Sequence, residues 1–397
     1  MASLNGVQTT DAGNRQEQSN GDTIQQARNC LEFRHNLRRR VYGGRNALRL
    51  EGALMRAGSA NPSEQVRWGI LGTARIATRK VIPAMQRGRF SRVHAVGSRD
   101  AGRAGQAADE LGIARSYASY DAVLADPDID AVYIPLPNHM HVEWTRRAAE
   151  AGKHVLCEKP IGLTAADVAQ LIEVRERTGV LIQEAFMVRT HPQWLGARDI
   201  ARSGRLGIVR SITGYFSFFN DDPANIRNIK TYGGGGIFDI GCYLVNTARM
   251  IFEDEPRRVC ALIEEIPPTG VDWMASMMLD FNGRHAVGTC SMQLAHAQRI
   301  TIAGTRGRVE IEIPFNAPPD RPCRIFVEDS PPGEVPERHV VEFETCDQYT
   351  IQGDLFSRAV LDRTSPPYPL EDSLANMRVI DALFRSGRSG GWEAPGT

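Results

Sequence analysis

A short apolar segment at residues 66–71 runs directly into a turn whose residues suit the binding of a pyrophosphate. From Gly72 the turn reads Gly-Thr-Ala-Arg-Ile-Ala, against the pattern Gly-x-Gly-x-x-Gly of dinucleotide-binding turns. The first glycine, which makes the tight turn, is kept, and alanine, the smallest substitute, stands at the other two positions. Because the turn lies between an apolar strand and a helix, it predicts a dinucleotide site formed by Gly72, Thr73, Ala74, Arg75 and Ile76.

A second apolar stretch ends at Ser98 and Arg99, about twenty residues beyond that turn. Enzymes that bind NAD usually carry an acid here, which accepts hydrogen bonds from the ribose hydroxyls. A hydroxyl and a guanidinium suit a 2′-phosphate instead, because arginine forms charge-assisted hydrogen bonds with phosphate and a carboxylate would repel it. The pair therefore predicts NADP as the cofactor. Two alternatives stay open: Asp100 takes the acid's place if the register shifts by two, or Arg99 is a solvated residue before a helix.

Residues suited to acid–base chemistry stand further along the chain. Lys159 lies within a Glu-Lys-Pro run, and Asp239 and Tyr243 follow a run of four glycines at residues 233–236. Because Asp239 and Tyr243 are four residues apart, they share one face of the helix that is predicted to open there. Taken singly, each residue has a simpler interpretation, as a solvated lysine, a helix-capping aspartate, a core tyrosine or a flexible glycine loop.

The elements that must position these residues alternate between strand and helix over the first half of the chain. Strands are predicted at residues 66–71, 93–97, 130–134, 154–157 and 180–184, and helices after the Gly72 turn and at residues 100–111, 141–151 and 165–178. This alternation is typical of βαβ units and a parallel sheet. Ligands bind at the carboxyl ends of the strands in such a sheet. One edge is therefore expected to hold Gly72, Ser98, Arg99, Pro135, Leu136, Pro137, Asn138, Glu158, Lys159 and Pro160.

Beyond residue 185 the pattern changes to α+β. A helix is expected within residues 186–202, and strands follow at 208–219, 259–264, 273–281, 286–293, 299–303 and 308–312. A helix from the glycine run to about residue 251 interrupts the strands, and helices near 349–361 and 371–384 close the chain. A succession of strands with few intervening helices predicts a largely antiparallel open sheet.

The predicted fold class is thus an α/β Rossmann domain with a parallel doubly wound sheet, plus an α+β C-terminal domain. The first spans residues 64–185 and the second, which binds substrate and mediates oligomerisation, spans 186–397. Residues 1–63 are predicted to be a disordered extension, because residues 1–30 are polar and lack an apolar period. Three arginines at residues 38–40 raise the alternative of a degenerate twin-arginine export signal, but charged residues follow where that signal needs an apolar segment. An over-long start, with Met55 as the initiator, is the favoured interpretation.

Composition narrows the functional class. The chain has 47 basic and 47 acidic residues, so its charge does not favour nucleic acid or an anionic membrane as a partner. No apolar run approaches the roughly 20 residues that span a bilayer. Seven cysteines are scattered without a Cys-x-x-Cys pair, which indicates reduced thiols in a cytoplasmic protein and no metal site. A small-molecule partner is favoured.

Four motifs stand in order along the chain. They are Trp-Gly-Ile-Leu-Gly-Thr-Ala from residue 68, Val-Tyr-Ile-Pro-Leu-Pro-Asn from 132, Glu-Lys-Pro from 158 and Gly-Gly-Gly-Ile-Phe-Asp-Ile-Gly-Cys-Tyr from 234. Together, from about residue 65 to the C-terminus, the chain resembles the Gfo/Idh/MocA oxidoreductases. The branch it resembles holds NADP-dependent D-xylose 1-dehydrogenase, dimeric dihydrodiol dehydrogenase and glucose–fructose oxidoreductase. Tyr243 favours that branch, because inositol dehydrogenases carry a histidine there.

The resemblance implies roles for individual residues. Lys159 would lie beside the nicotinamide and bind the substrate oxygen, Tyr243 would exchange the hydroxyl proton, and Asp239 would orient the substrate or balance the lysine charge. A tyrosine with a pKa of about 10 is a poor base at neutral pH, and an adjacent ammonium lowers that pKa by stabilising the phenolate. His141 matches a family position near the nicotinamide. Arg189 either contacts cofactor or substrate or forms a salt bridge.

We therefore expect an NADP-dependent enzyme that transfers hydride between nicotinamide and a CH–OH group of a sugar or dihydrodiol. A reductase of a keto- or anhydro-sugar would use the same residues in reverse. A non-catalytic NADP-binding sensor is a third interpretation, which the presence of Lys159, Asp239 and Tyr243 argues against. Family likeness implies a homodimer through the open face of the second sheet, and covering an edge-rich sheet is physically reasonable.

Overall fold

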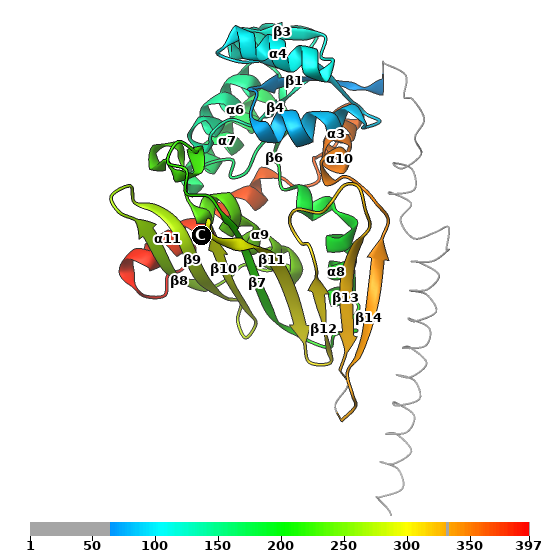
Figure 1. Cartoon of the computed structure of the whole chain (residues 1–397), viewed down its shortest axis with the longest axis vertical. Helices are drawn as coiled ribbons and strands as arrows, with labels where there is room; N and C mark the ends of the chain where they lie inside the picture. The colour runs from blue at the N-terminus through cyan, green and yellow to red at the C-terminus, as the bar shows by residue number, and fades with distance from the viewer. Residues whose placement is uncertain (1–63, 331–332, 397) are drawn as a thin grey trace, which may run out of the picture. The chain divides into compact units, whose positions relative to one another are not determined.

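The structure, a computed structural model, describes residues 64–330 and 333–396. The predictions made for residues 1–63, namely a disordered extension, a twin-arginine signal and a start at Met55, lie outside the described residues. Two sheets organise the described part of the chain (Figure 1). Sheet A holds six strands from the first half, and sheet B holds eight strands from the second half.

Sheet A is parallel throughout, with the strand order β3-β2-β1-β4-β5-β6. Its strands are β1 (Val66–Leu71), β2 (Ser91–Gly97), β3 (Arg115–Tyr117), β4 (Ala131–Ile134), β5 (His154–Cys157) and β6 (Ile182–Glu184). The central strands β1 and β4 are almost wholly buried, which explains their continuous apolar sequence. The predicted parallel doubly wound sheet is confirmed. Strand β3 and helix α5 (Tyr120–Ala125) were not predicted.

Helices connect the strands of sheet A where the sequence pattern placed them. They are a π-helical segment (Ala77–Val81) continued by α3 (Ile82–Gln86), then α4 (Ala101–Leu111), α6 (His141–Glu150) and α7 (Ala165–Thr178). Helix α7 begins with a capping box, in which Thr164 accepts from the main chain of Asp167 and the Asp167 side chain returns the bond. It ends at Gly179, whose φ of 71° is easily adopted without a Cβ.

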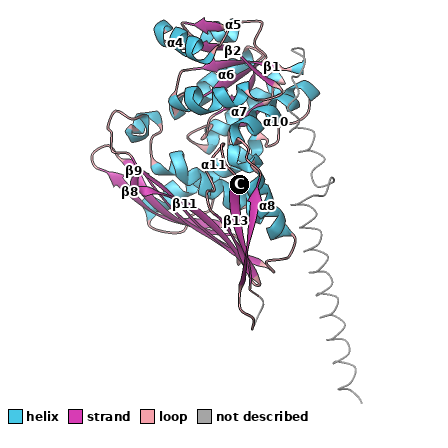
Figure 2. Cartoon of the chain, turned by 45° about the vertical axis from the view of Figure 1, so that its right-hand side comes forward, coloured by secondary structure: helices cyan, strands magenta, loops and turns pink. Residues whose placement is uncertain are grey.

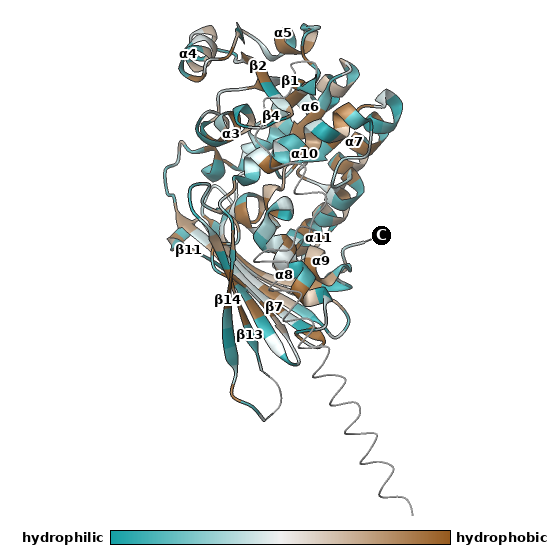
Figure 3. Cartoon of the chain, turned by 90° about the vertical axis from the view of Figure 1, so that its right-hand side faces the viewer, coloured by the Kyte–Doolittle hydropathy of each residue, from teal (hydrophilic) through white to brown (hydrophobic). Residues whose placement is uncertain are grey.

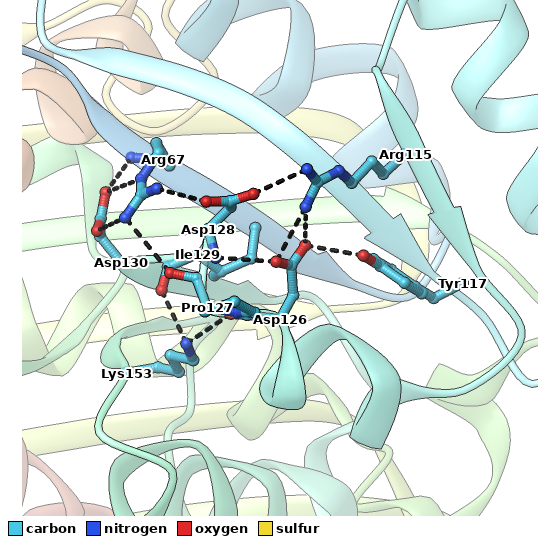
Figure 4. Close-up of polar contacts among 9 residues, drawn as sticks. All are labelled: Arg67, Arg115, Tyr117, Asp126, Pro127, Asp128, Ile129, Asp130 and Lys153. Atoms are coloured by element: carbon cyan, nitrogen blue, oxygen red, sulfur yellow. Dashed lines mark hydrogen bonds and ion pairs between the residues drawn. The ribbon is translucent and has the colours of Figure 1, made fainter. Parts of the chain in front are cut away.

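Charged side chains tie together the amino-terminal ends of four strands of sheet A (Figure 4). The network comprises Arg67, Arg115, Tyr117, Asp126, Asp128, Asp130 and Lys153. Asp126 accepts from the Tyr117 hydroxyl at 2.8 Å and from the Arg115 guanidinium at 2.9 Å, and also from the main-chain N–H of Asp128 at 2.8 Å. Burial opposes ionisation of Asp126, but these bonds outweigh burial and lower its pKa to about 2.

Sheet B follows the order β14-β13-β12-β11-β7-β10-β9-β8, and all neighbours pair antiparallel except β7 and β10. Its strands are β7 (Val209–Phe219), β8 (Arg258–Ile266), β9 (Val271–Asp280), β10 (His285–Ser291), β11 (Gln293–Gly304), β12 (Gly307–Ile311), β13 (Cys323–Asp329) and β14 (Glu337–Phe343). The largely antiparallel open sheet is confirmed, and β13 and β14 extend it beyond the predicted strands.

One face of sheet B is covered by helices α8 (Pro192–Arg202), α9 (Cys242–Phe252) and α11 (Leu370–Ser389). Figure 2 shows α8 and α11 on one side of the strands, and no described helix covers the other side. Apolar side chains stand exposed on that open face, among them Tyr215, Leu262, Met278 and Val287.

Helix α10 (Gln348–Asp362) returns from the second half of the sequence to sheet A. The Trp68 indole on β1 donates to the Ser357 hydroxyl at 3.1 Å. The Asp354 carboxylate accepts from the main-chain N–H of Arg89 and Phe90 at 2.8 and 2.9 Å. Residues that the sequence analysis assigned to the second domain therefore complete the packing of the first.

None of the helices in the described ranges combines the length and the apolar character that a membrane crossing requires.

We predict that Asp126→Asn destabilises the protein in a pH-dependent way. The folded-state pKa of Asp126 is about 2 and its ordinary value is 3.8, so its stabilisation is present above pH 3.8 and is lost as the pH falls towards 2. Loss of the charge-assisted bonds should lower the free energy of unfolding by about 2 kcal/mol at neutral pH. Urea unfolding as a function of pH measures this, with the exposed Asp109→Asn as the control. An equal difference from wild type at pH 3 and pH 7 would contradict the assignment.

Candidate active site

A single cavity of about 1310 Å³ extends from the carboxyl ends of β1 and β2 past β5 to the helix-covered side of sheet B. It brings together most of the predicted site residues. Those lining it are Gly72, Thr73, Ala74, Arg75, Ile76, Ser98, Arg99, Leu136, Pro137, Asn138, Glu158, Lys159, Asp239 and Tyr243. His141 and Arg189 do not line it.

The turn after β1 lets main chain approach the cavity closely. Gly72 adopts a φ of +117°, and its N–H donates to the carbonyl of Gly97 at 2.8 Å. A Cβ at Gly72 would lie 3.1 Å from the Leu136 side chain, so any larger residue would crowd the turn as well as strain it. The geometry fits the binding of a pyrophosphate by the main chain of this turn.

Exposed cationic side chains surround this end of the cavity. They are Arg75, Arg79, Lys80, Arg99 and Arg103. Arg75 and Arg99 were predicted from the sequence, whereas Arg79, Lys80 and Arg103 were not. A signal was present for Arg79, because it stands four residues beyond Arg75 in the helix that was predicted after the Gly72 turn. This concentration of positive charge suits a ligand with several phosphates.

Asp100 has a structural task at the start of α4. Its carboxylate accepts from the main-chain N–H of Arg103 at 3.1 Å and caps the helix. Its own N–H donates to the Ser98 hydroxyl at 3.2 Å. The alternative in which Asp100 binds ribose hydroxyls competes with this cap, whereas the Arg99 side chain is exposed at the cavity.

Two loops meet across the cavity: one follows β4, and the other leads into the glycine run. The Asn138 amide donates to the carbonyl of Gly233 at 2.8 Å. The rings of His139 and Tyr232 stack with centroids 4.6 Å apart. The cofactor-side loop is therefore joined directly to the segment that carries Asp239.

The glycine run allows three main-chain segments to pack more closely than Cβ atoms would permit. A Cβ on Gly234 would overlap the Arg227 carbonyl, and a Cβ on Gly235 would overlap the Asp272 carboxylate. Gly235 also has a φ of +130°, a region that residues with a Cβ rarely adopt. Asp272, on β9, accepts from the N–H of Ile237 at 2.7 Å and so caps the helix that opens there.

Asp239 lies between two cations at the centre of the cavity wall. The Lys159 ammonium donates to the Asp239 carbonyl and lies 3.4 Å from its Oδ1. The Arg227 Nε donates to its Oδ2 at 2.8 Å. Burial opposes the ionisation of Asp239, but the charges of Lys159 and Arg227 outweigh it and lower the pKa of this carboxyl. Arg227 was not predicted, because it lies in a one-turn 3-10 helix (Ile226–Asn228) without a recognisable motif.

Lys159 stays protonated in this setting. Burial disfavours its charge, but the charges of Asp239 and Glu158 outweigh burial and raise the pKa of the ammonium. The side chain is only 11% exposed, so these interactions are weakly screened. Glu158 itself accepts from the buried Tyr133 hydroxyl at 2.6 Å.

Tyr243 corrects one expectation of the sequence analysis. We expected the lysine cation to lower its pKa, but burial raises the pKa of Tyr243 well above its ordinary value. The ammonium bonds to Asp239 and lies 5.0 Å from the centre of the tyrosine ring. The hydroxyl lies 3.5 Å from the sulfur of Met187. Tyr243 is therefore a neutral hydrogen-bond donor at neutral pH.

His141 and Arg189 support the site from outside the cavity. The buried His141 ring lies 2.7 Å from the carbonyls of both Leu136 and Pro160, which links the turns after β4 and β5. Arg189 pairs with Asp372 and stacks on the Tyr368 ring. The salt bridge is one of the two roles left open for Arg189, and a contact with cofactor or substrate stays a prediction.

The far end of the cavity combines aromatic and polar side chains. Phe216 and Phe315 stack with centroids 4.7 Å apart, and the Tyr243 ring lies 5.4 Å from Phe315. His296 and Asn316 also line this end. An apolar wall with a few polar groups suits a small ligand that has both C–H and hydroxyl surfaces. In the described ranges, no cluster of three or more His, Cys, Asp or Glu side chains is placed to hold a metal ion.

Comparison with protein families assigns both halves of the chain. Residues 66–186 match the Gfo/Idh/MocA oxidoreductase family with its NAD-binding Rossmann fold, and residues 194–310 match the Gfo/Idh/MocA C-terminal domain. The chain belongs to the Gfo/Idh/MocA oxidoreductase family, as the four sequence motifs predicted.

Individual relatives include enzymes of sugar metabolism. An uncharacterized oxidoreductase of Rhizobium meliloti is 47% identical over 83% of this chain and 98% of its own length. The D-xylose 1-dehydrogenase (NADP(+)) 2 of Haloferax volcanii is 40% identical over 81% of this chain and 98% of its own. A solved complex of the 3-ketoreductase of Actinomadura kijaniata with NADP and TDP-benzene is 30% identical, covers 81% of this chain and 98% of that chain, and superposes with a TM-score of 0.76.

We predict that Gly235→Ala disrupts the site, whereas Gly105→Ala does not. The new Cβ at residue 235 would collide with Asp272 in an unfavourable backbone conformation, and should cost about 2 kcal/mol or more of stability. Gly105 lies within α4 with no atom close to its Cβ position, so alanine there should be neutral or stabilising. Thermal unfolding of both variants measures the difference. Equal melting temperatures would show that the close approach at Gly235 is dispensable.

Proposed function

We propose that this chain is an NADP-dependent oxidoreductase that transfers hydride between nicotinamide and a CH–OH group of a sugar or dihydrodiol, in the manner of D-xylose 1-dehydrogenase. The observation that carries the proposal is the meeting of Lys159, Asp239 and Tyr243 in one cavity whose other end is lined by cations. The name of the Haloferax relative, a D-xylose 1-dehydrogenase with NADP(+), supports the same cofactor and substrate class. The scattered cysteines support a cytoplasmic location.

The residues at the Gly72 end fit NADP. The main chain of the Gly72 turn would hold the pyrophosphate, and Ser98 and Arg99 would hold the 2′-phosphate. Arg79 and Arg103 lie close enough along their helices to add positive charge there. When bound, NADP supplies the nicotinamide carbon that accepts or donates hydride.

Lys159 and Tyr243 would act on the oxygen of the reacting group. An ammonium has three N–H donors. Lys159 directs two of them towards the carbonyl and Oδ1 of Asp239, which leaves the third for the substrate. The Tyr243 hydroxyl has a weak acceptor, the Met187 sulfur, as its hydrogen-bond partner among the described residues, and would be a second donor to the substrate. Two donors on one oxygen stabilise the negative charge that develops there as hydride moves.

Reduction of a carbonyl is the second candidate function, and the protonation states favour it. The pKa values of both Lys159 and Tyr243 are raised, so both groups carry the proton that a reduced carbonyl requires. Oxidation of an alcohol by the same residues requires that proton to leave, and is therefore favoured at alkaline pH. A non-catalytic sensor remains a weaker alternative, because binding alone does not require this acid–base set.

The open face of sheet B supports a homodimer. Tyr215 and Val287 lie on neighbouring strands, and Met278 and Leu262 extend this exposed apolar area towards β8. Much of β14 is hydrophilic instead (Figure 3). A second copy of the chain seated on the apolar strands would remove this surface from water. A monomeric mass in sedimentation equilibrium would rule this arrangement out.

We predict that Arg99→Gln weakens the binding of NADPH much more than that of NADH. Loss of a charge-assisted bond to the 2′-phosphate should reduce affinity for NADPH by about 10- to 100-fold. Fluorescence titration with both cofactors measures the ratio. Arg92→Gln, which changes an exposed arginine on β2 outside the cavity, should leave both affinities unchanged. A parallel loss for both cofactors would place the 2′-phosphate elsewhere.

We predict that Lys159→Met and Tyr243→Phe each lower kcat at least about 100-fold, because each removes a donor to the reacting oxygen. NADPH should still bind. The assay follows NADPH absorbance with D-xylose, D-glucose, 1,5-anhydrofructose and trans-dihydrodiols. In the wild type, the rate of oxidation should rise with pH through the alkaline range, because the pKa values of both groups are raised.

Tyr215→Phe is the matched control for the tyrosine, since Tyr215 lies on the open face of sheet B. Full turnover by Tyr243→Phe would remove the tyrosine from proton transfer. Tight NADPH binding without turnover of any substrate in this panel would favour the sensor.

A further inference from the structure

Arg227 is tied to the start of the Asp239 helix through both its main chain and its side chain. Its carbonyl accepts from the N–H of Gly235 at 2.9 Å, in the close contact that the glycine run permits. Its Nε donates to the Asp239 carboxylate at 2.8 Å. The loop around Arg227 and the helix around Asp239 therefore form one unit.

The carboxylate of Asp239 is divided unequally between its two cations. Arg227 holds Oδ2 at 2.8 Å, an ordinary length for a charge-assisted bond, whereas Lys159 lies 3.4 Å from Oδ1. The Lys159 ammonium donates instead to the main-chain carbonyl of Asp239. One carboxylate is thus shared between two cations, with its shorter side-chain contact to Arg227.

We propose that Arg227 is a positioning residue for hydride transfer: by holding Oδ2, it keeps the Asp239 carboxylate from closing onto Lys159, so that the ammonium keeps an N–H for the substrate. The inference rests on the proposed function. A carboxylate without this second partner would turn towards the nearest cation, which is Lys159. The ammonium would then be more fully neutralised and a weaker donor to a developing alkoxide.

The charges around Lys159 determine how its protonation should respond. Asp239, Glu158 and the Cys242 thiol favour the proton on Lys159, the Tyr243 ring faces the ammonium, and the charge of Arg227 opposes the proton. Removing Arg227 takes away the opposing charge and frees Asp239 to approach. Both changes raise the pKa of Lys159.

Arg227→Gln tests the proposal in the full-length enzyme. It should lower kcat by about tenfold or more, with a smaller effect on KM, and leave NADPH affinity unchanged. The limb of the pH–rate profile that reports Lys159 should move to higher pH. Arg227→Lys keeps a cation and should restore part of kcat and part of the shift. Arg210→Gln is the matched control, because Arg210 is exposed on β7 and does not line the cavity.

A rise in KM at constant kcat would mean that Arg227 contacts the substrate directly, and would overturn the proposal. An unchanged kcat and an unchanged pH profile would also overturn it. So would a loss of kcat that comes without a pH shift and that Arg227→Lys does not restore.

A second measurement requires no substrate. Trace acetylation of the free enzyme across a range of pH, followed by mass spectrometry, gives the pKa of Lys159 in each variant. The pKa should be higher in Arg227→Gln than in wild type or Arg210→Gln. An identical pKa would overturn the positioning role. Because this outcome is independent of turnover, it stays informative even if the wild type acts on none of the sugars and the proposed function fails.

Discussion

The site depends on a close approach of main chain that only glycine permits. At Gly234 and Gly235, three segments meet: the loop of Arg227, the end of β9 that carries Asp272, and the start of the helix that carries Asp239. Without Cβ atoms in this layer, the Arg227 carbonyl can accept a bond from the helix start, and its side chain can reach Asp239. The position of the central carboxylate is therefore set by backbone packing, and the charges then act on a fixed geometry.

At the opposite end of the cavity, a glycine also permits a close approach of the main chain, here at a single residue. Gly72 lets the turn after β1 pass beside Leu136, and the helix that follows opens with a π-helical segment, as does the helix after the glycine run. Such segments are uncommon and occur often at functional sites. Both ends of the cavity are thus formed where a strand or loop turns sharply into a helix, and the contact of Asn138 with Gly233 joins the two. The residues proposed to bind cofactor and those proposed to bind substrate therefore stand on connected segments.

Much of this frame could be predicted from the sequence, because it follows from strong local patterns. The apolar runs of sheet A, and the caps at Thr164 and Gly179, leave little choice of element. Strands β3 and β14 were missed, since the first has three residues and the second begins with Glu-Arg-His. The predicted site residues that stand on motifs line one cavity, whereas Arg227 was missed because only the folded chain brings its short 3-10 turn to Asp239.

The protonation states of the site residues were harder to predict than which residues lie in the site. A lysine near a tyrosine suggests a stabilised phenolate when the two are considered alone. In the folded chain the ammonium is engaged by Asp239, and burial decides the protonation of Tyr243. The sign of a pKa shift depends on every neighbouring group, including residues that belong to no sequence motif. In the proposed mechanism the donors are protonated and their strength depends on how Asp239 is shared, so the partner of that carboxylate matters as much to the chemistry as the residues of the motif.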